Sequence, residues 1–93
     1  MRHYCYIIYS KLLDRFYVGE TSDFEQRLSF HNIGHSGFTS KANDWELYLL
    51  IECRDKSMAS KIEKHIKSMK SEKYIKNLVV YSEIVAKLKT RYL

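Results

Sequence analysis

The segments Tyr4-Cys5-Tyr6-Ile7-Ile8-Tyr9 and Phe16-Tyr17-Val18-Gly19 decide the fold of this chain. Both are rich in β-branched and aromatic residues, which favour β-strands. The residues between them, 10–15, are mostly polar and include Asp14, so they predict a turn. Together the three segments predict an antiparallel hairpin.

The register of this hairpin determines which tyrosines share a face. We take a register in which Tyr9 faces Phe16, and in that register Tyr17 faces Ile8. Because side chains alternate between the two faces of a strand, Tyr6 and Tyr17 then lie on one face as diagonal neighbours. A slip of one residue would place them on opposite faces.

A helix, a loop and a third strand are predicted next. Residues 22–25 have the S-x-x-E form of a capping box, which predicts a helix that starts at Ser22 and runs to about Asn32. Its apolar side is expected to consist of Phe24, Leu28 and Ile33. Residues 34–44 (GHSGFTSKAND) predict a polar loop. Residues 45–53 are dense in large apolar side chains and predict a third strand, central in the sheet.

Three helices are predicted in the last part of the chain. Asp55 is a candidate N-cap for a long helix with an apolar stripe of Met58, Ile62, Ile66 and Met69. Residues 71–78 predict a short helix. Residues 82–93 predict a last one, whose inward side chains are Ile84, Val85, Leu88 and Tyr92. The order β-β-α-β-α-α-α predicts an α/β fold with a small three-stranded antiparallel sheet flanked by helices.

The length of 93 residues predicts a single domain, 1–93. Cys5 and Cys53 lie in apolar runs and show no zinc-binding spacing, although a disulfide between neighbouring strands stays open. The longest apolar run, residues 47–51, is far too short to span a membrane, and no secretory segment is recognised. A cytoplasmic location is therefore the expectation.

Charge is distributed unevenly along the chain, whose net charge is +5. Residues 1–53 carry five Lys/Arg and seven Asp/Glu, whereas residues 54–93 carry eleven and four, which gives net charges of −2 and +7. A basic half of this kind favours a polyanionic partner such as nucleic acid, although a solubilising basic face would have the same composition.

The two hairpin strands carry triplets that resemble the GIY…YIG signature of a nuclease superfamily. Tyr4-Cys5-Tyr6 departs from the first triplet at its first two positions and keeps its tyrosine. Tyr17-Val18-Gly19, eleven residues later, differs from the second triplet only by valine in place of isoleucine. Residues 19–21, Gly-Glu-Thr, resemble the G-x-T that follows the second tyrosine.

Later segments extend the resemblance over residues 4 to about 78. Residues 27–32 resemble the R-L-x-x-H-N helix motif of the small members, and residues 59–67 resemble their A-x-x-x-E-x-x-I-K helix. Lys41, the start of the third strand at 45–47 and the segment 70–75 also fit. The chain is most similar to the small stand-alone endonucleases of the GIY-YIG superfamily, whose relatives include a DNA-repair incision domain and some homing and restriction endonucleases.

This resemblance implies a site of five residues. Glu63 matches the acidic residue that holds one divalent metal ion, Mg²⁺ (or Mn²⁺). Arg27 matches the arginine that neutralises the scissile phosphate. Tyr6 and Tyr17 match tyrosines that position or activate the attacking water, and His31 matches a histidine that assists. A phenol with an ordinary pKa near ~10 needs such help to act as a base, and which tyrosine does so is left open.

Lysines recur at every third residue from Lys61 to Lys76 and would form a broad band beside Glu63 on a continuous helix. The residues predicted to contact nucleic-acid phosphates are Lys41, Lys61, Lys64, Lys67 and Lys70. Such contacts give affinity without sequence readout.

The expected function is a metal-dependent endonuclease with low intrinsic sequence specificity, for which DNA is favoured over RNA. A protein partner or a homodimer could supply targeting. One alternative is a nucleic-acid-binding module of the same fold with little or no catalysis, and another is a protein-interaction domain. Asn77 is the one candidate for an asparagine that several members carry after the metal-binding helix, and no motif around it supports the match.

Overall fold

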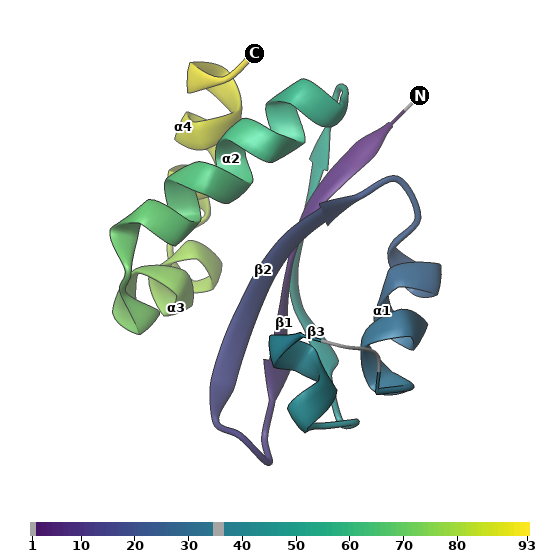
Figure 1. Cartoon of the computed structure of the whole chain (residues 1–93). Helices are drawn as coiled ribbons and strands as arrows, with labels where there is room; N and C mark the ends of the chain where they lie inside the picture. The colour runs from purple at the N-terminus through teal and green to yellow at the C-terminus, as the bar shows by residue number, and fades with distance from the viewer. Residues whose placement is uncertain (1, 35–36) are drawn as a thin grey trace.

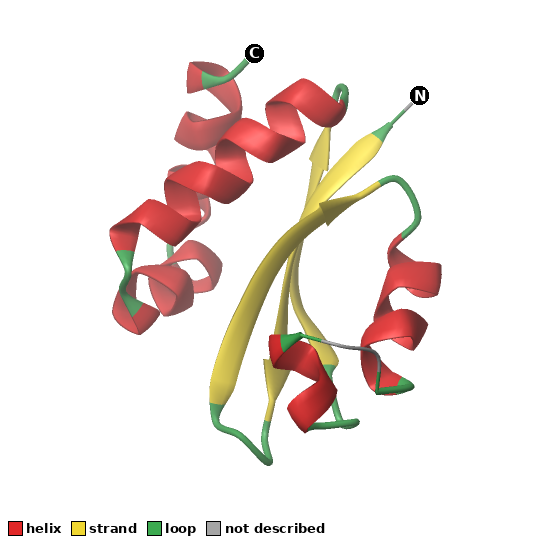
Figure 2. Cartoon of the chain, viewed as in Figure 1, coloured by secondary structure: helices red, strands yellow, loops and turns green. Residues whose placement is uncertain are grey.

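The computed structural model describes residues 2–34 and 37–93. Its three strands form one antiparallel sheet in the order β2-β1-β3. The strands are β1 (His3–Ser10), β2 (Arg15–Thr21) and β3 (Glu46–Cys53), and the helices are α1 (Phe24–Asn32), the 3-10 helix η1 (Phe38–Lys41), α2 (Lys56–Met69), α3 (Glu72–Val80) and α4 (Ser82–Arg91). Helices α1 and η1 lie on one side of the sheet and α2, α3 and α4 on the other (Figure 1). The predicted fold class is confirmed, with η1 as an added element (Figure 2).

The hairpin has the predicted register. Tyr9 pairs with Phe16 and Ile8 with Tyr17. Tyr6 pairs with Gly19, so Tyr6 and Tyr17 are diagonal neighbours, and both pack in the hydrophobic cluster on the α1 side of the sheet. The strands extend one or two residues beyond the predicted ends because ladder pairing continues as far as Tyr4 with Thr21 and Ser10 with Arg15.

The prediction that the third strand is central was wrong, because β1 occupies the centre and β3 lies at an edge. The large side chains of β3 are not all buried: Leu47 and Leu50 are 47% and 38% exposed. The pairing of β1 with β3 shifts between Ile7 and Ile8, which leaves Tyr48 as an extra residue. Tyr48 and Leu49 therefore both pack on the α2 side, and the apolar run reflects this bulge rather than a central position.

The N-cap of α1 lies one residue later than predicted. Asp23, not Ser22, is the N-cap, and its carboxylate accepts a hydrogen bond from the backbone N–H of Gln26 at 3.1 Å. Asp23 is itself held by Thr21, whose Oγ1 accepts from the Asp23 N–H at 3.1 Å. Ile33 follows the helix and is 70% exposed, so its predicted place on the apolar side was wrong.

Helix α2 covers the other face of the sheet, as its apolar stripe predicts. Asp55 is its N-cap, and Met58, Ile62 and Ile66 are buried against the sheet. Met69 is 45% exposed because the helix ends there and Lys70 takes a left-handed conformation with φ of 47°. The lysine band therefore does not lie on one continuous helix, since Lys73 and Lys76 belong to α3.

The remaining elements complete the α2 side. Helices α3 and α4 lie close to their predicted positions, and Leu88 of α4 is buried. Cys5 and Cys53 are free thiols in the core. The predicted loop 34–44 contains η1, and its residues His35 and Ser36 lie outside the described residues. Within the described part of the chain, no helix combines the length and apolar character needed to cross a bilayer.

Candidate active site

The hairpin places two tyrosines side by side on the α1 face of the sheet. The rings of Tyr6 and Tyr17 are 6.4 Å apart between centroids. Tyr6 is 1% exposed, whereas Tyr17 is half-buried. The Tyr6 hydroxyl lies against the backbone of its strand partner Gly19, where an added Cβ would come within 2.5 Å of that oxygen. The absence of a side chain at Gly19 is therefore what gives the Tyr6 hydroxyl its place.

We expect Gly19→Ala to displace the Tyr6 ring, because a buried ring at such a distance cannot yield without moving its neighbours. Overpacking of this kind costs about 1–3 kcal/mol of unfolding free energy. Urea denaturation monitored by circular dichroism measures this loss. The matched control is Ser29→Ala on the exposed surface of α1, which should leave stability within ~0.5 kcal/mol of wild type. A Gly19→Ala protein as stable as that control would show that Tyr6 is not confined here.

A hydrogen-bonded chain leads from Tyr6 through His31 to Thr39. The Tyr6 hydroxyl is 2.8 Å from His31 Nε2, and His31 Nδ1 is 2.8 Å from Thr39 Oγ1. Burial raises the pKa of Tyr6 well above its usual value, as does Tyr17, while the positive charge of Arg27 opposes the rise. Burial, and next the Arg27 charge, lower the pKa of His31.

The lowered pKa of His31 favours a neutral imidazole, in which one ring nitrogen donates and the other accepts. The hydroxyls of Tyr6 and Thr39 can each donate or accept, so either tautomer of His31 satisfies the chain. Both ring nitrogens of the buried imidazole are hydrogen-bonded, Nε2 to Tyr6 and Nδ1 to Thr39.

Thr39 was missed by sequence reasoning, as was the support that holds it. The indole Nε1–H of Trp45 donates to the Thr39 carbonyl at 2.9 Å. The side chain of Asn32 binds the backbone of Trp45 twice, accepting from its N–H at 2.8 Å and donating to its carbonyl at 3.0 Å. The end of α1, η1 and the start of β3 are tied together in this way. In the sequence Thr39 is one polar residue of a polar loop, and no local signal marks it.

Arg27 comes from α1, one turn before His31, and its side chain is exposed. Its guanidinium lies close enough to influence the pKa of both Tyr6 and His31. Arg27 also lines a surface hollow with Gln26 and Phe30. The residue therefore presents a positive charge to solvent beside the two buried groups.

Glu63 reaches the same region from α2 on the other side of the sheet. Its side chain is 18% exposed, and its Oε2 forms an ion pair with Lys67 Nζ at 2.7 Å. The Lys67 ammonium also lies 5.6 Å from the centroid of the Tyr17 ring. Glu63 is among the charges that raise the pKa of Tyr6. Tyr6, Tyr17, Arg27 and His31 thus lie together on the α1 side, and Glu63 of α2 is linked to Tyr17 through the Lys67 ammonium.

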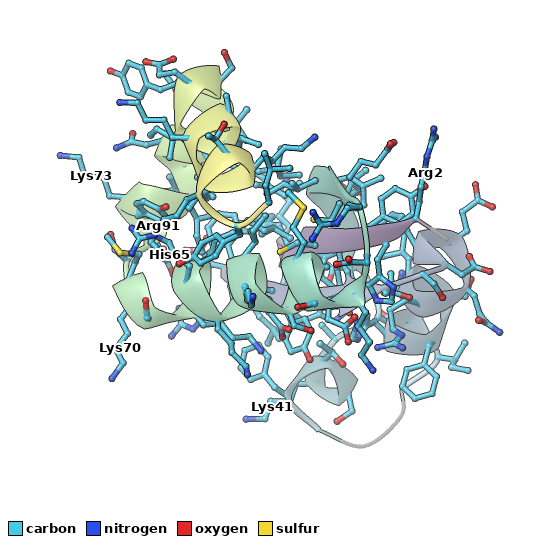
Figure 3. The ribbon with its side chains drawn as sticks, turned by 90° about the horizontal axis from the view of Figure 1, so that it is seen from above. Arg2, Lys41, His65, Lys70, Lys73 and Arg91 are labelled. Atoms are coloured by element: carbon cyan, nitrogen blue, oxygen red, sulfur yellow. The ribbon has the colours of Figure 1, made fainter. Side chains whose placement is uncertain are left out.

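The predicted phosphate-binding lysines are all exposed: Lys41, Lys61, Lys64, Lys67 and Lys70. Lys41 comes from η1, and its Nζ lies 5.7 Å from the centroid of the Phe38 ring. Figure 3 places Lys41 and Lys70 on one side of the molecule and Lys73 on another. Lys41 and Lys70, which come from opposite faces of the sheet, therefore extend to a common side. The lysines from Lys61 to Lys76 do not all extend to that side.

The residues present fit a hard divalent cation held by one carboxylate. In residues 2–34 and 37–93, no cluster of three or more His, Cys, Asp or Glu side chains is arranged to enclose a metal ion. Glu63 offers one partly accessible carboxylate beside the tyrosines. Mg²⁺ commonly binds through one or two carboxylates, retains several waters and takes further ligands from substrate phosphate. Glu63 would be the protein ligand of such an ion.

A match to a known protein family covers the part of the chain that contains the candidate site. The model of the GIY-YIG catalytic domain matches residues 2–78, which include all five candidate catalytic residues. No curated protein and no solved structure matches the chain. The matched region ends within α3, so α4 lies beyond it. The chain belongs to the GIY-YIG catalytic domain family, and with it to proteins of nuclease type that act on nucleic acid.

Proposed function

We propose that this protein is a metal-dependent endonuclease that hydrolyses phosphodiester bonds, with DNA as its favoured substrate. The observation that carries the proposal is the hydrogen-bonded chain from Tyr6 through the buried His31 to Thr39, which lies beside Tyr17. A structural histidine would need no neighbouring Tyr17, Arg27 and Glu63. Their presence provides what phosphodiester hydrolysis requires: a group to orient water, a cation for the phosphate and a ligand for a metal.

Tyr17 is the tyrosine that we assign to the attacking water. Tyr6 is 1% exposed and its hydroxyl is already bound to His31, so it cannot contact a water from bulk solvent in this arrangement. Tyr17 is half-buried, and its ring lies 5.0 Å from that of His31 between centroids. Tyr6 and His31 then act behind it as a neutral, hydrogen-bonded polar support.

Arg27 and Glu63 have complementary roles in this proposal. Arg27 binds the scissile phosphate through its guanidinium, whose paired N–H groups match two phosphate oxygens. Glu63 holds one Mg²⁺ or Mn²⁺ ion, which when bound stabilises negative charge on the phosphate and on the departing oxygen. Exposed lysines such as Lys41 and Lys70, which extend to a common side of the molecule, bind further phosphates of the nucleic acid (Figure 3).

Sequence readout is expected to be weak. Lysine contacts to phosphates carry no information about the bases. A protein partner or a second copy of the chain would supply targeting where it is needed. Substrate specificity would then come from the shape of the nucleic acid or from an assembly rather than from this site.

Nicking of labelled substrates tests the proposal. Purified protein is incubated with duplex, single-stranded and branched DNA and with RNA, in the presence of Mg²⁺, Mn²⁺ or EDTA. We expect cleavage that requires the metal, and a loss of about 10²-fold in rate for Arg27→Ala, because one group that stabilises transition-state charge is removed. The matched control is Arg15→Ala, which removes an exposed arginine at the far end of β2.

Two results would contradict the proposal. Equal cleavage by wild type and Arg27→Ala would assign the activity to a contaminant or to another site. Salt-sensitive binding of nucleic acid without cleavage under any condition would instead identify a binding module of the same fold.

A further inference from the structure

Lys67 differs from the other lysines near the site in the position of its ammonium group. Nζ lies 2.7 Å from Oε2 of Glu63 and 5.6 Å from the centroid of the Tyr17 ring. Among the ion pairs of the described residues, the pair of Lys67 with Glu63 is the one that contains a candidate catalytic residue. The ammonium therefore lies on the carboxylate that a metal ion would need.

A metal ion and Lys67 compete for this carboxylate. The Glu63 side chain is only 18% exposed, which limits the accessible surface that two cations could share. Two cations held on one carboxylate also repel each other at short distance. The Lys67 side chain is 49% exposed and has a flexible four-carbon stem, so the lysine can move at low cost.

We propose that Lys67 is a positioning residue that exchanges partners. Its ammonium neutralises Glu63 before a divalent cation binds, and it transfers to a phosphate of the nucleic acid when Glu63 becomes a metal ligand. This inference rests on the proposed function, because it takes Glu63 as that ligand. The lysine thereby keeps the metal-free site close to neutral and gives the loaded site an additional phosphate contact beside Tyr17.

The weakness of the existing contacts supports such an exchange. A lysine four residues after a glutamate on a helix forms a stabilising but weak pair. The contact with the Tyr17 ring is a second weak attraction. Together they hold the ammonium in place without a metal and can be displaced by a doubly charged ion, which is attracted to the carboxylate about twice as strongly.

Titration of Mn²⁺ into nucleic-acid-free protein, followed by isothermal calorimetry, tests the first half of the exchange. We expect Lys67→Met to tighten Mn²⁺ binding about tenfold, because a competing positive charge near ~4 Å from the ion is removed. The matched control is Lys56→Met on the same helix, an exposed lysine outside the set predicted to contact phosphates. Its effect should be less than about threefold. Glu63→Gln serves as the reference that weakens binding.

Binding of a fluorescent duplex in EDTA, measured by anisotropy, tests the second half. Glu63→Gln frees Lys67, so it should tighten metal-free binding when Lys67 is present. In a Lys67→Met background, the gain in duplex affinity caused by Glu63→Gln should be at least threefold smaller than in the wild-type background. A double-mutant cycle isolates this difference as the coupling between the two residues. Thermal unfolding of each variant verifies that all are folded.

The outcomes separate this inference from the proposed function. Mn²⁺ binding that depends on Glu63 but is unchanged or weaker in Lys67→Met overturns the exchange alone, as does equal tightening of duplex binding in both backgrounds. Mn²⁺ binding that is absent or independent of Glu63 in every variant removes the metal ligand, and the proposed function falls together with the exchange.

Discussion

Glu63→Gln is expected to lower the rate of phosphodiester cleavage by about 10³-fold at saturating Mg²⁺ while nucleic-acid binding is retained. The physical reason is that an amide oxygen keeps the shape of the side chain but loses the negative charge that holds a hard cation. Loss of one group that stabilises transition-state charge costs about 10²–10³-fold in other enzymes, and loss of the carboxylate proposed to hold the ion should lie at or above that upper end.

Stability measurements separate this effect from damage to the fold. The substitution also breaks the ion pair between Glu63 and Lys67, which is worth ~0.5 kcal/mol or less for a helix pair of this spacing. The melting temperature should therefore change little. Glu46→Gln, at an exposed position on the opposite edge strand β3, is the matched control and should cleave at the wild-type rate. A Glu63→Gln protein that cleaves within tenfold of wild type would contradict the assignment of Glu63 as metal ligand.

Tyr17→Phe is expected to lower the cleavage rate by about 10²–10⁴-fold, the range of a group that transfers a proton in the transition state. Tyr6→Phe is expected to cost less in rate, about tenfold, because its buried hydroxyl supports the site from behind. For the free energy of unfolding, we expect the larger loss in Tyr6→Phe. Tyr6→Phe leaves His31 Nε2 without its partner in a buried place and should cost about 1–3 kcal/mol of unfolding free energy, whereas Tyr17→Phe should cost much less.

Single-turnover cleavage and urea denaturation measure the two effects on the same proteins. Tyr48→Phe is the matched control, because Tyr48 is half-buried in the cluster on the face of the sheet opposite to Tyr6 and Tyr17. It should change neither quantity strongly. A larger loss of rate in Tyr6→Phe than in Tyr17→Phe would show that the buried tyrosine, not the half-buried one, meets the attacking water.

The shared face of Tyr6 and Tyr17 followed from strand periodicity, which is local, once a register pairing Tyr9 with Phe16 was assumed, and the structure has that register. Alternation of side chains and one pairing, Tyr9 with Phe16, are enough to bring the two rings to one face. The buried stripe of α2 followed in the same way from helical spacing, and Glu63 beside it is half-buried as a result. Patterns that repeat within ten residues depend on backbone geometry alone.

The predictions that were wrong concern features that depend on contacts with neighbouring residues in the folded structure. Ser22 and Asp23 are both good N-cap residues, and the hydrogen bonds of Thr21 with Asp23 favour the second. The apolar run of β3 suggested a central strand, but a bulge at Tyr48 turns two adjacent side chains to one face of an edge strand. The three-residue lysine repeat continued through Lys70, where the helix ends. In each case the local sequence pattern was compatible with two different structures.

The sequence alone therefore established the family motifs, the hairpin that pairs the tyrosines and the helix that carries Glu63. The tertiary structure added the partner of each polar group: Thr39 for His31, Asn32 for Trp45, and the ammonium of Lys67 between Glu63 and Tyr17. Hydrophobic periodicity is visible in the sequence because it reflects the geometry of a single helix or strand. A hydrogen bond between distant residues forms only once packing has brought two elements within about 3 Å, and no spacing along the chain encodes that distance.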